Sequence, residues 1–240
     1  MTRTLLTLIV ALVMVPVGTF ADTYEQMWKN VAEAARADQP RTQIAILGKI
    51  AARAEAAHDY GQLLTAELRT MMTWSQVSGD SLAPAVRRME LRAERAGGSD
   101  PVLAAVCHAV LGRVYRENPQ LSDSVAAVSR RHYRLAMEHP GLLARTSAKG
   151  YQPLLVKGSD SRIFADDMLS VMAYETGDFA TATRYYSEHA NRKATMLTSL
   201  EQLRQLKHPA VKRASQSGYV ASLDSLISLY SDLPECGEVA

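Results

Sequence analysis

The sequence predicts an all-α protein built as an array of antiparallel helix hairpins, and three observations lead to that prediction. Strand signals are scarce, because no alternating run of Val, Ile, Thr and Tyr of useful length follows residue 21. Apolar residues recur instead at the three- and four-residue spacing that lines one face of a helix. The 240 residues include 35 alanines, which favour helix and let neighbouring helices approach closely. Short turns separate the expected helices, so consecutive helices are expected to stack on one another.

Capping and stop signals divide the first half of the chain into helices. Apolar stripes mark the first two of them, at Ile44, Leu47, Gly48 and Ala51 and then at Leu64, Leu68, Met71 and Met72. The expected boundaries, in chain order, are a cap at Asp59, a start at Ser81, an end at Gly97–Gly98, a start at Asp100–Pro101, an end at Asn118–Pro119, and a helix over 122–138 that stops at His139–Pro140. Proline suits the first helical turn, where its missing N–H costs nothing.

The second half begins with an interruption. Residues 141–158 carry Gly150, Pro153 and Gly158, which predict a short helix followed by an irregular connector. Four apolar stripes then follow, each of which predicts a helix. The first consists of Phe164, Met168, Val171 and Met172 and ends at Gly177, and the second consists of Phe179, Ala182, Tyr186 and Ala190. The third consists of Met196, Leu200 and Leu203, and the fourth of Leu223, Leu226, Ile227 and Tyr230.

The first twenty-one residues have the features of a secretory signal peptide. Arg3 precedes an apolar run, Leu5–Val15, and Thr19-Phe20-Ala21 places small residues at the positions that a signal peptidase requires. An uncleaved membrane anchor is the alternative, but that run falls short of the roughly 20 residues needed to span a bilayer. We therefore expect cleavage after Ala21, export to the periplasm, cell envelope or extracellular space, and no membrane span in the mature chain.

Composition and motifs argue against several classes of chemistry. A net charge of +2 gives no basic footprint for nucleic acid. The six histidines include no His-Glu-x-x-His and no pair at i,i+4, which argues against a zinc site. Cys107, flanked by Val106 and Val110, is expected to be a small core residue, and Cys236 cannot form a thioester because Val239 stands where glutamine is needed. We expect no enzymatic activity, no catalytic residue, no metal and no cofactor.

Two stretches carry a helix–turn–helix pattern. Residues 172–179 contain the sequence Met-Ala-Tyr-Glu-Thr-Gly-Asp-Phe, and Ala182, Tyr186 and Ala190 follow. This pattern resembles the tetratricopeptide repeat, in which a glycine such as Gly177 allows the tight turn, an aromatic such as Phe179 plugs the hairpin, and an alanine sits where the helices cross. Residues 111–115 look like the first helix of a second, degenerate unit, with residues 132–136 in its second helix. The predicted fold is accordingly a tetratricopeptide-like α-solenoid.

The chain also resembles the N-terminal helical region of the alpha-2-macroglobulin-like (MG2-domain) envelope proteins of Bacteroidota. The residues that carry this resemblance are spread over the mature sequence: 24–29, 80–84, 132–143, 151–155, 160–164, 167–170, 191–194, 223–227 and 232–240. In that family, the resemblance implies, a secreted helical segment precedes macroglobulin β-sandwich domains, and some members carry a bait region and a thioester for protease trapping or envelope defence. None of those later elements is present in these 240 residues.

The functional hypothesis is therefore a non-catalytic interaction or scaffold segment of an exported macroglobulin-like protein. Its expected partner is a protein, and the macroglobulin domains of the same polypeptide are one candidate. The alternative is a stand-alone periplasmic tetratricopeptide-like adaptor that binds a peptide or an envelope protein. The expected organisation is a signal peptide at 1–21, a helical hairpin array at 22–157, and tetratricopeptide-like repeats at 158–240 with the last one incomplete.

The C-terminal sequence predicts an unsupported end. The apolar stripe from Leu223 to Tyr230 is expected to need a following helix as its partner. Asp232-Leu233-Pro234-Glu235 has the features of a helix start, yet only one further turn follows it. We therefore expect several large apolar side chains to be exposed and the chain to fray from about Ser215 onward.

Overall fold

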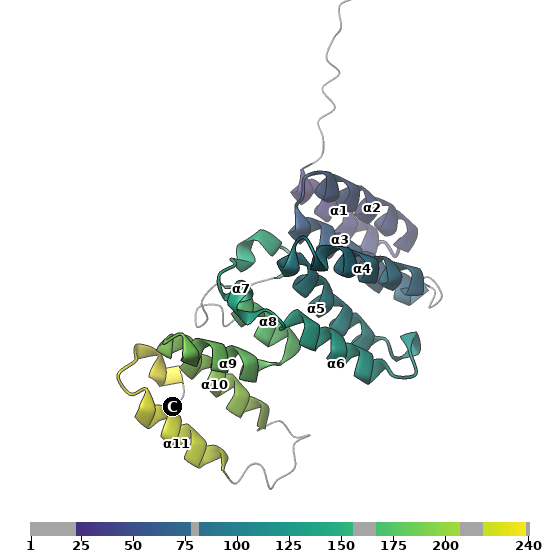
Figure 1. The fold of residues 1–240 in the computed structure, drawn as a ribbon. Coiled ribbons are helices and arrows are strands. Elements are labelled where there is room, and N and C mark those ends of the chain that lie inside the picture. The colour runs from purple at the N-terminus through teal and green to yellow at the C-terminus, as the bar shows by residue number, and fades with distance from the viewer. Residues whose placement is uncertain (1–22, 78–81, 156–166, 207–217, 239–240) are drawn as a thin grey trace, which may run out of the picture.

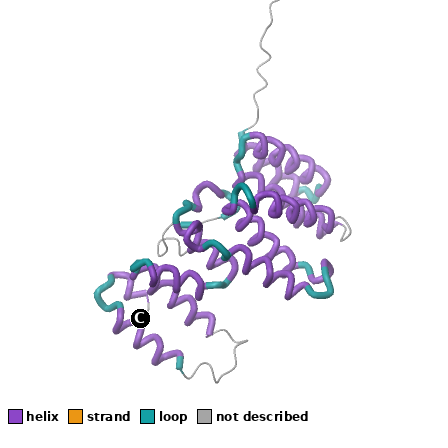
Figure 2. The backbone as a smooth tube through the Cα atoms, viewed as in Figure 1, coloured by secondary structure: helices purple, strands orange, loops and turns teal. Residues whose placement is uncertain are grey.

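A computed structural model describes residues 23–77, 82–155, 167–206 and 218–238 of the chain. Within these ranges the protein has eleven α-helices and no strand, apart from one isolated antiparallel bridge between Ser147 and Asp167. The predicted all-α class is therefore confirmed for the described ranges (Figure 2). The predictions for the signal peptide, including cleavage after Ala21, and those for Ser81 and Phe164 lie outside the described residues.

The helices follow one another with short connections (Figure 1). In chain order they are α1 Tyr24–Arg36, α2 Pro40–Ala56, α3 Tyr60–Val77, α4 Leu82–Gly97, α5 Pro101–Glu117, α6 Val125–Ala136, α7 Pro140–Ala144, α8 Met168–Thr176, α9 Phe179–Glu188, α10 Arg192–Leu206 and α11 Tyr219–Leu229. Short 3₁₀ turns cover Pro119–Leu121, Ala148–Tyr151 and Pro234–Glu238.

Two described helix starts follow the capping signals that the sequence analysis identified. Asp59 Oδ1 accepts a hydrogen bond from the Gln62 N–H at 3.1 Å and so caps α3. Asp100 Oδ1 accepts one from the Leu103 N–H at 3.0 Å, with Pro101 as the first residue of α5. These starts are set by local hydrogen bonds, which explains why the sequence predicted them.

Helices that are consecutive in the sequence pack side by side over most of the chain, with α5 against α6 and α2 against α3 as the most extensive pairs. Figure 1 shows α1 to α4 at one end, α5 to α8 in the middle, and α9 to α11 at the other end. The largest hydrophobic core runs from α3 to the start of α10, while smaller clusters join α1 to α3 and α10 to α11. Small side chains occupy part of this core, among them the buried residues Ala104, Ala105, Ala109 and Ala182.

The helix expected over 122–138 is shorter than predicted, because α6 covers only Val125–Ala136. Ser122 has an extended backbone, and its Oγ accepts a hydrogen bond from the Ser124 N–H at 3.1 Å. Such a local turn competes with the helix and delays its start. Beyond Pro140 the structure agrees with the sequence: the short helix α7 leads into a 3₁₀ turn and irregular chain.

The C-terminal apolar stripe has a partner, which corrects the expectation that it would be exposed. Leu226 and Tyr230 are each 8% exposed and lie in a cluster with Met196, Leu197 and Leu200 of α10. Leu223, Ile227 and the turn residues Leu233 and Cys236 pack beside them. The stripe is covered by the preceding helix rather than by a following one, a pairing that helical periodicity cannot specify.

Charged residues at the start of α10 hold the turn that follows α11. Both terminal nitrogens of Arg192 donate to the Asp232 carboxylate, and Nη2 also donates to the Leu229 carbonyl at 3.2 Å. Lys193 forms an ion pair with Glu235. Because a bidentate guanidinium–carboxylate pair fixes geometry as well as charge, these contacts tie residues 229–235 to α10.

We expect the change Arg192→Gln to loosen this segment. Amide hydrogen exchange should become faster across α11 and the Pro234–Glu238 turn, because the bidentate pair and the bond to the Leu229 carbonyl are both lost. Arg204→Gln is the matched control, since Arg204 pairs with Glu201 on the same helix and makes no ion pair with another described element. Equal exchange rates in wild type and Arg192→Gln would contradict the assignment.

Candidate functional site

The hairpin of α8 and α9 contains four of the residues singled out in the sequence. Gly177 follows α8 with φ +76, a left-handed conformation that glycine adopts without steric cost, and its N–H donates to the Ala173 carbonyl at 2.9 Å. Phe179 opens α9 and is buried, with its ring edge-on to Tyr174 at 5.1 Å. Ala182 and Tyr186 are buried on the same helix. The structure therefore brings Gly177, Phe179, Ala182 and Tyr186 into one helical hairpin.

Ala190 does not lie where the sequence predicted it. Helix α9 ends at Glu188, and Ala190 is exposed with φ +56 in the turn between α9 and α10. The Asn191 N–H donates to the Tyr186 carbonyl at 2.9 Å, and Asn191 Oδ1 accepts from the Ala194 N–H at the start of α10. These turn hydrogen bonds end α9 two residues before Ala190, so its assignment to the second helix is wrong.

Tyr186 also has a polar partner that the sequence did not indicate. Its hydroxyl donates to Asp167 Oδ1 at 2.7 Å and lies 2.7 Å from Ser170 Oγ. Asp167 Oδ1 also accepts from the Ser170 N–H at 2.8 Å, so Asp167 is the N-cap of α8. Burial raises the pKa of Asp167 above its usual value, although these hydrogen bonds act in the opposite direction. The cluster locks α9 onto the start of α8.

A second polar cluster lies on the packed faces of α5 and α6. Nδ1 of His108 is 3.1 Å from Nδ1 of His132, so one ring nitrogen donates and the other accepts. The sequence missed this pair because its members lie 24 residues apart on different helices. His108 and Tyr115 lie seven residues apart, a spacing that puts them on one face of a helix and that could be read from the sequence. Only the packing of α6 on α5 brings His132 to that face.

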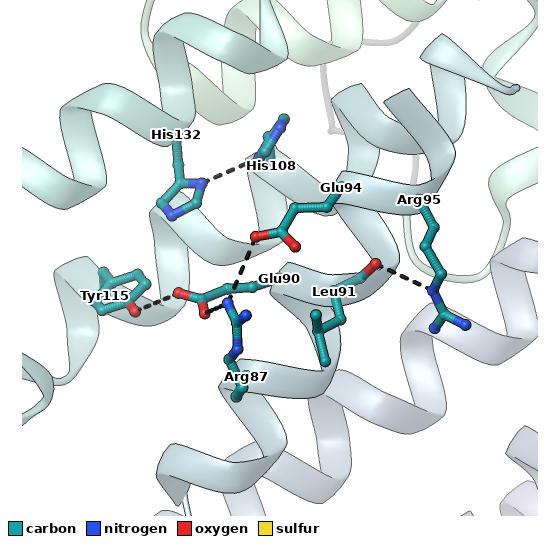
Figure 3. Close-up of polar contacts among 8 residues, drawn as sticks. All are labelled: Arg87, Glu90, Leu91, Glu94, Arg95, His108, Tyr115 and His132. Atoms are coloured by element: carbon teal, nitrogen blue, oxygen red, sulfur yellow. Dashed lines mark hydrogen bonds and ion pairs between the residues drawn. The ribbon is translucent and has the colours of Figure 1, made fainter. Parts of the chain in front are cut away.

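The histidine pair continues into a hydrogen-bonded chain on α4 and α5 (Figure 3). The Tyr115 ring stacks on His132 with a centroid distance of 5.6 Å and an interplanar angle of 10°. The Tyr115 hydroxyl donates to Glu90 Oε1 at 2.8 Å, and Arg87 Nη1 lies 3.0 Å from Glu90 Oε2. Arg87 also pairs with Glu94 at 3.5 Å. Three helices therefore contribute to one polar patch.

Burial keeps both imidazoles neutral near pH 7. It lowers the pKa of His132 to about 4, and the neighbouring His108 and Arg131 act in the same direction against the opposing effect of Glu90. Burial and Arg131 also lower the pKa of His108, opposed by Glu138. On the same patch, burial and the hydrogen bond to Glu90 raise the pKa of Tyr115 to about 12.

We expect these histidines to make the protein less stable in acid. Both are deprotonated in the folded state below their unfolded pKa of about 6.5, so the unfolded chain binds more protons there. Their contribution to the free energy of unfolding is complete above about pH 6.5. It is lost as the pH falls toward about 4, the pKa of His132 in the folded state. One proton gives at most about 1.4 kcal/mol per pH unit, and solvent access reduces that slope.

The measurement is the free energy of unfolding in urea at pH 7.5 and pH 5.0, for wild type and His132→Gln. The variant should lose less stability between the two values. The loss of stability must be compared between wild type and His132→Gln rather than taken from one protein alone. Burial also raises the pKa of Asp167 and of Glu175, and these two carboxyl groups change the free energy of unfolding with pH in the opposite direction. Equal losses in both proteins would contradict the prediction.

Other candidate residues stay apart from this patch. Cys107 is fully buried, as predicted from its apolar neighbours, and Cys236 is partly buried. Both are free thiols. Burial raises the pKa of Cys107 to about 12, so its thiol is not a ready nucleophile. Among the described residues no group of three or more His, Cys, Asp or Glu side chains converges as a metal site.

An open groove of about 640 Å³ is lined by residues of α10 and α11. Small polar and apolar residues form its walls: Ser199, Gln202, Leu203, Gly218, Ala221, Ser222, Ser225, Leu226 and Leu229. Leu229 is 64% exposed at its edge, and Val220, on the same helix, is 65% exposed. Small side chains at Ala221, Ser222 and Ser225 would allow close approach of a further chain segment.

Comparison with known proteins adds no family to these observations. No helix in the described ranges is long and apolar enough to cross a membrane. Neither the models of known protein families, nor the curated proteins, nor the solved structures contain a match to the chain.

Proposed function

We propose that this chain is a non-catalytic helical scaffold segment of an exported macroglobulin-like protein, and that it binds a protein partner through the α10–α11 groove. The observation that carries the proposal is that groove, about 640 Å³ in volume, with the exposed Leu229 at its edge. Exposed large apolar side chains beside a groove are typical of protein-binding surfaces.

The helix pairs support a tetratricopeptide-like arrangement. In the α8–α9 pair, Gly177 makes the turn, and Phe179 and Ala182 of α9 are buried. In the α5–α6 pair, Gly112 lies directly against the Tyr133 ring. Stacked helix pairs of this kind present extended surfaces to partners. Each repeat buries its apolar face against its neighbours, which leaves outward surfaces available for recognition.

The resemblance supplies the cellular context of the proposal. The predicted signal peptide, with cleavage expected after Ala21, would direct the mature chain to the periplasm or envelope. The resemblance implies that macroglobulin β-sandwich domains of the same polypeptide are the partner. Those domains would follow residue 240 as further coding sequence. The chain would then be the helical prefix of a protein that acts in protease trapping or envelope defence.

The test begins with the DNA that follows codon 240, which should encode repeated β-strand modules. The first module, produced separately, is titrated into the 240-residue protein by calorimetry. Leu229→Glu should weaken binding at least tenfold, because it puts a charge at the edge of the groove. Leu91→Glu is the matched control, since Leu91 is also exposed but lies on α4. Equal binding by Leu229→Glu and wild type would exclude the groove.

A stand-alone adaptor is the second candidate, and the covered C-terminal stripe favours it. The burial of Leu226 and Tyr230 against α10 means that α11 does not need a following helix to cover this stripe. Strong hydrogen-exchange protection over 223–230 in a monomer, together with no β-strand modules encoded downstream, would support the adaptor over the macroglobulin prefix.

A further inference from the structure

Helix α6 carries positive charge that no acidic residue of the same helix balances. Among the described helices, α6 alone combines three basic residues with no aspartate or glutamate. Its arginines, Arg130, Arg131 and Arg134, are all exposed. Helical geometry places Arg130 and Arg134 on successive turns, about 6 Å apart along the axis, and turns Arg131 about 100° away from Arg130. The outward side of α6 is therefore basic over more than one turn.

These arginines also differ from others in the chain in having no carboxylate partner. Asp123 before the helix and Glu138 after it are exposed, and neither forms an ion pair with an arginine of α6. The three arginines make no ion pair with any other residue that the structure describes. Arginines on other helices do form such pairs, among them Arg87–Glu90, Arg92–Glu67, Arg113–Glu117 and Arg192–Asp232.

A fourth arginine extends this charge where α6 meets α5. Arg116 of α5 is exposed, and its guanidinium carbon lies 5.5 Å from the centre of the Tyr133 ring. Arg130 precedes Tyr133 by three residues, which makes the two side chains neighbours on the helix surface. Arg116 and Arg130 therefore lie on the same side of α6. The ion pairs that cross this side join Glu117 and Glu175 to Arg113 and leave Arg116 out.

We propose that this basic face, formed by Arg116, Arg130, Arg131 and Arg134, binds an acidic segment of a protein partner. A guanidinium group can donate two parallel hydrogen bonds to one carboxylate, which makes arginine selective for that group. Residues four apart on a helix are separated by about 6 Å along its axis, and residues two apart on an extended chain by about 6.6 Å. Both spacings match Arg130 and Arg134. The partner segment therefore carries Asp or Glu at i,i+4 on a helix or at i,i+2 on an extended chain.

The other side chains of α6 favour a protein segment over a membrane or a nucleic acid. Ala126 and Ala127 are exposed beside the arginines, and such small side chains allow the backbone of a partner to come close. No large apolar side chain of α6 is exposed, so the helix has nothing to insert among lipids. Its two rings are buried, at His132, and half-buried, at Tyr133, so bases have no exposed ring on which to stack.

The experiment is a fluorescence-anisotropy titration of a labelled peptide, in which Glu alternates with Ala, with the 240-residue protein at low ionic strength. We expect the double variant Arg130→Gln/Arg134→Gln to bind about fivefold more weakly than wild type, because each exposed ion pair contributes a factor of about 1.5 to 5. Added salt should weaken binding by wild type, since exposed charges are screened. A peptide with Gln in place of Glu should not bind.

The matched control is the double variant Arg36→Gln/Arg41→Gln, which removes the same charge from two other exposed positions. It should bind the Glu peptide as wild type does. Circular dichroism should show the same helix content and unfolding temperature for both double variants, because the side chains that are changed are exposed. The basic face shares no residue with the α10–α11 groove, so Leu229→Glu should bind the peptide normally, and the two proposals can fail separately.

Three results would overturn the proposal. The first is wild type that does not bind the Glu peptide, and the second is an equal loss of affinity in the two double variants, which would show that only net charge matters. The third is binding of phosphatidylglycerol vesicles or of single-stranded DNA through Arg130 and Arg134 without binding of the peptide. That result would assign the basic face to a lipid surface or to a nucleic acid.

Discussion

Replacing Gly61 with alanine should destabilise the protein by about 3 kcal/mol or more, at the upper end of the cost of overpacking. A Cβ atom at Gly61 would lie 2.1 Å from the Gln152 carbonyl oxygen and 2.7 Å from the carbonyl carbons of Gln152 and Tyr151. These are backbone atoms, which cannot rotate away as a side chain can. The connector after the Ala148–Tyr151 turn would have to move away from α3, with loss of the packing that the buried Tyr151 makes there.

Urea unfolding followed by circular dichroism measures this loss as a lower midpoint with an unchanged slope. Gly48→Ala is the matched control: Gly48 is an exposed glycine inside α2, and an added Cβ meets no atom within 4 Å. Alanine there should stabilise the protein by about 0.5–1 kcal/mol, because it restricts the unfolded chain. A Gly61→Ala protein as stable as wild type would show that the two backbones are further apart in solution.

Gly112→Ala should also be strongly destabilising, by about 1–3 kcal/mol. An added Cβ would lie 2.4 Å from Cδ1 and Cε1 of the Tyr133 ring, and 3.0 Å from its Cγ. The ring cannot simply rotate away, because the two helices are joined closely here: Ser129 Oγ donates to the Gly112 carbonyl at 2.7 Å. The substitution therefore forces α6 away from α5.

A double-mutant cycle with Tyr133→Ala isolates this contact. With the ring removed, Gly112→Ala should become neutral or stabilising, since alanine is the better helix former by about 1 kcal/mol. The free energy of unfolding of all four proteins, measured in urea, gives the coupling energy. Additive effects of the two substitutions would mean that the cost at Gly112 does not arise from Tyr133.

Features governed by short-range interactions could be predicted from the sequence. The caps at Asp59 and Asp100 and the left-handed turn at Gly177 each involve residues within a few positions of one another. The burial of Cys107 followed from its apolar neighbours. By the same logic the sequence placed Phe179 and Ala182 on the inner face of a hairpin.

Features that depend on the register of two helices could not be predicted. The His108–His132 pair exists only because α6 packs on α5 in one particular register along the helix axis. Ala190 continued a helical stripe in the sequence, but turn hydrogen bonds that involve Asn191 ended the helix first. Likewise, the stripe on α11 was visible, while the choice of α10 as its partner was not.

The sequence by itself determined that the described chain is helical, where α3 and α5 begin, where α4, α5 and α8 end, and which faces are apolar. Tertiary structure alone decided which helices meet, how the polar patch of Glu90, Tyr115, His108 and His132 assembles, and why Gly61 and Gly112 must lack a side chain. The physical reason is the distance along the chain over which each kind of interaction acts. Propensity, capping and periodicity act within a few residues of the chain, whereas close packing fixes contacts between residues that are far apart in the sequence.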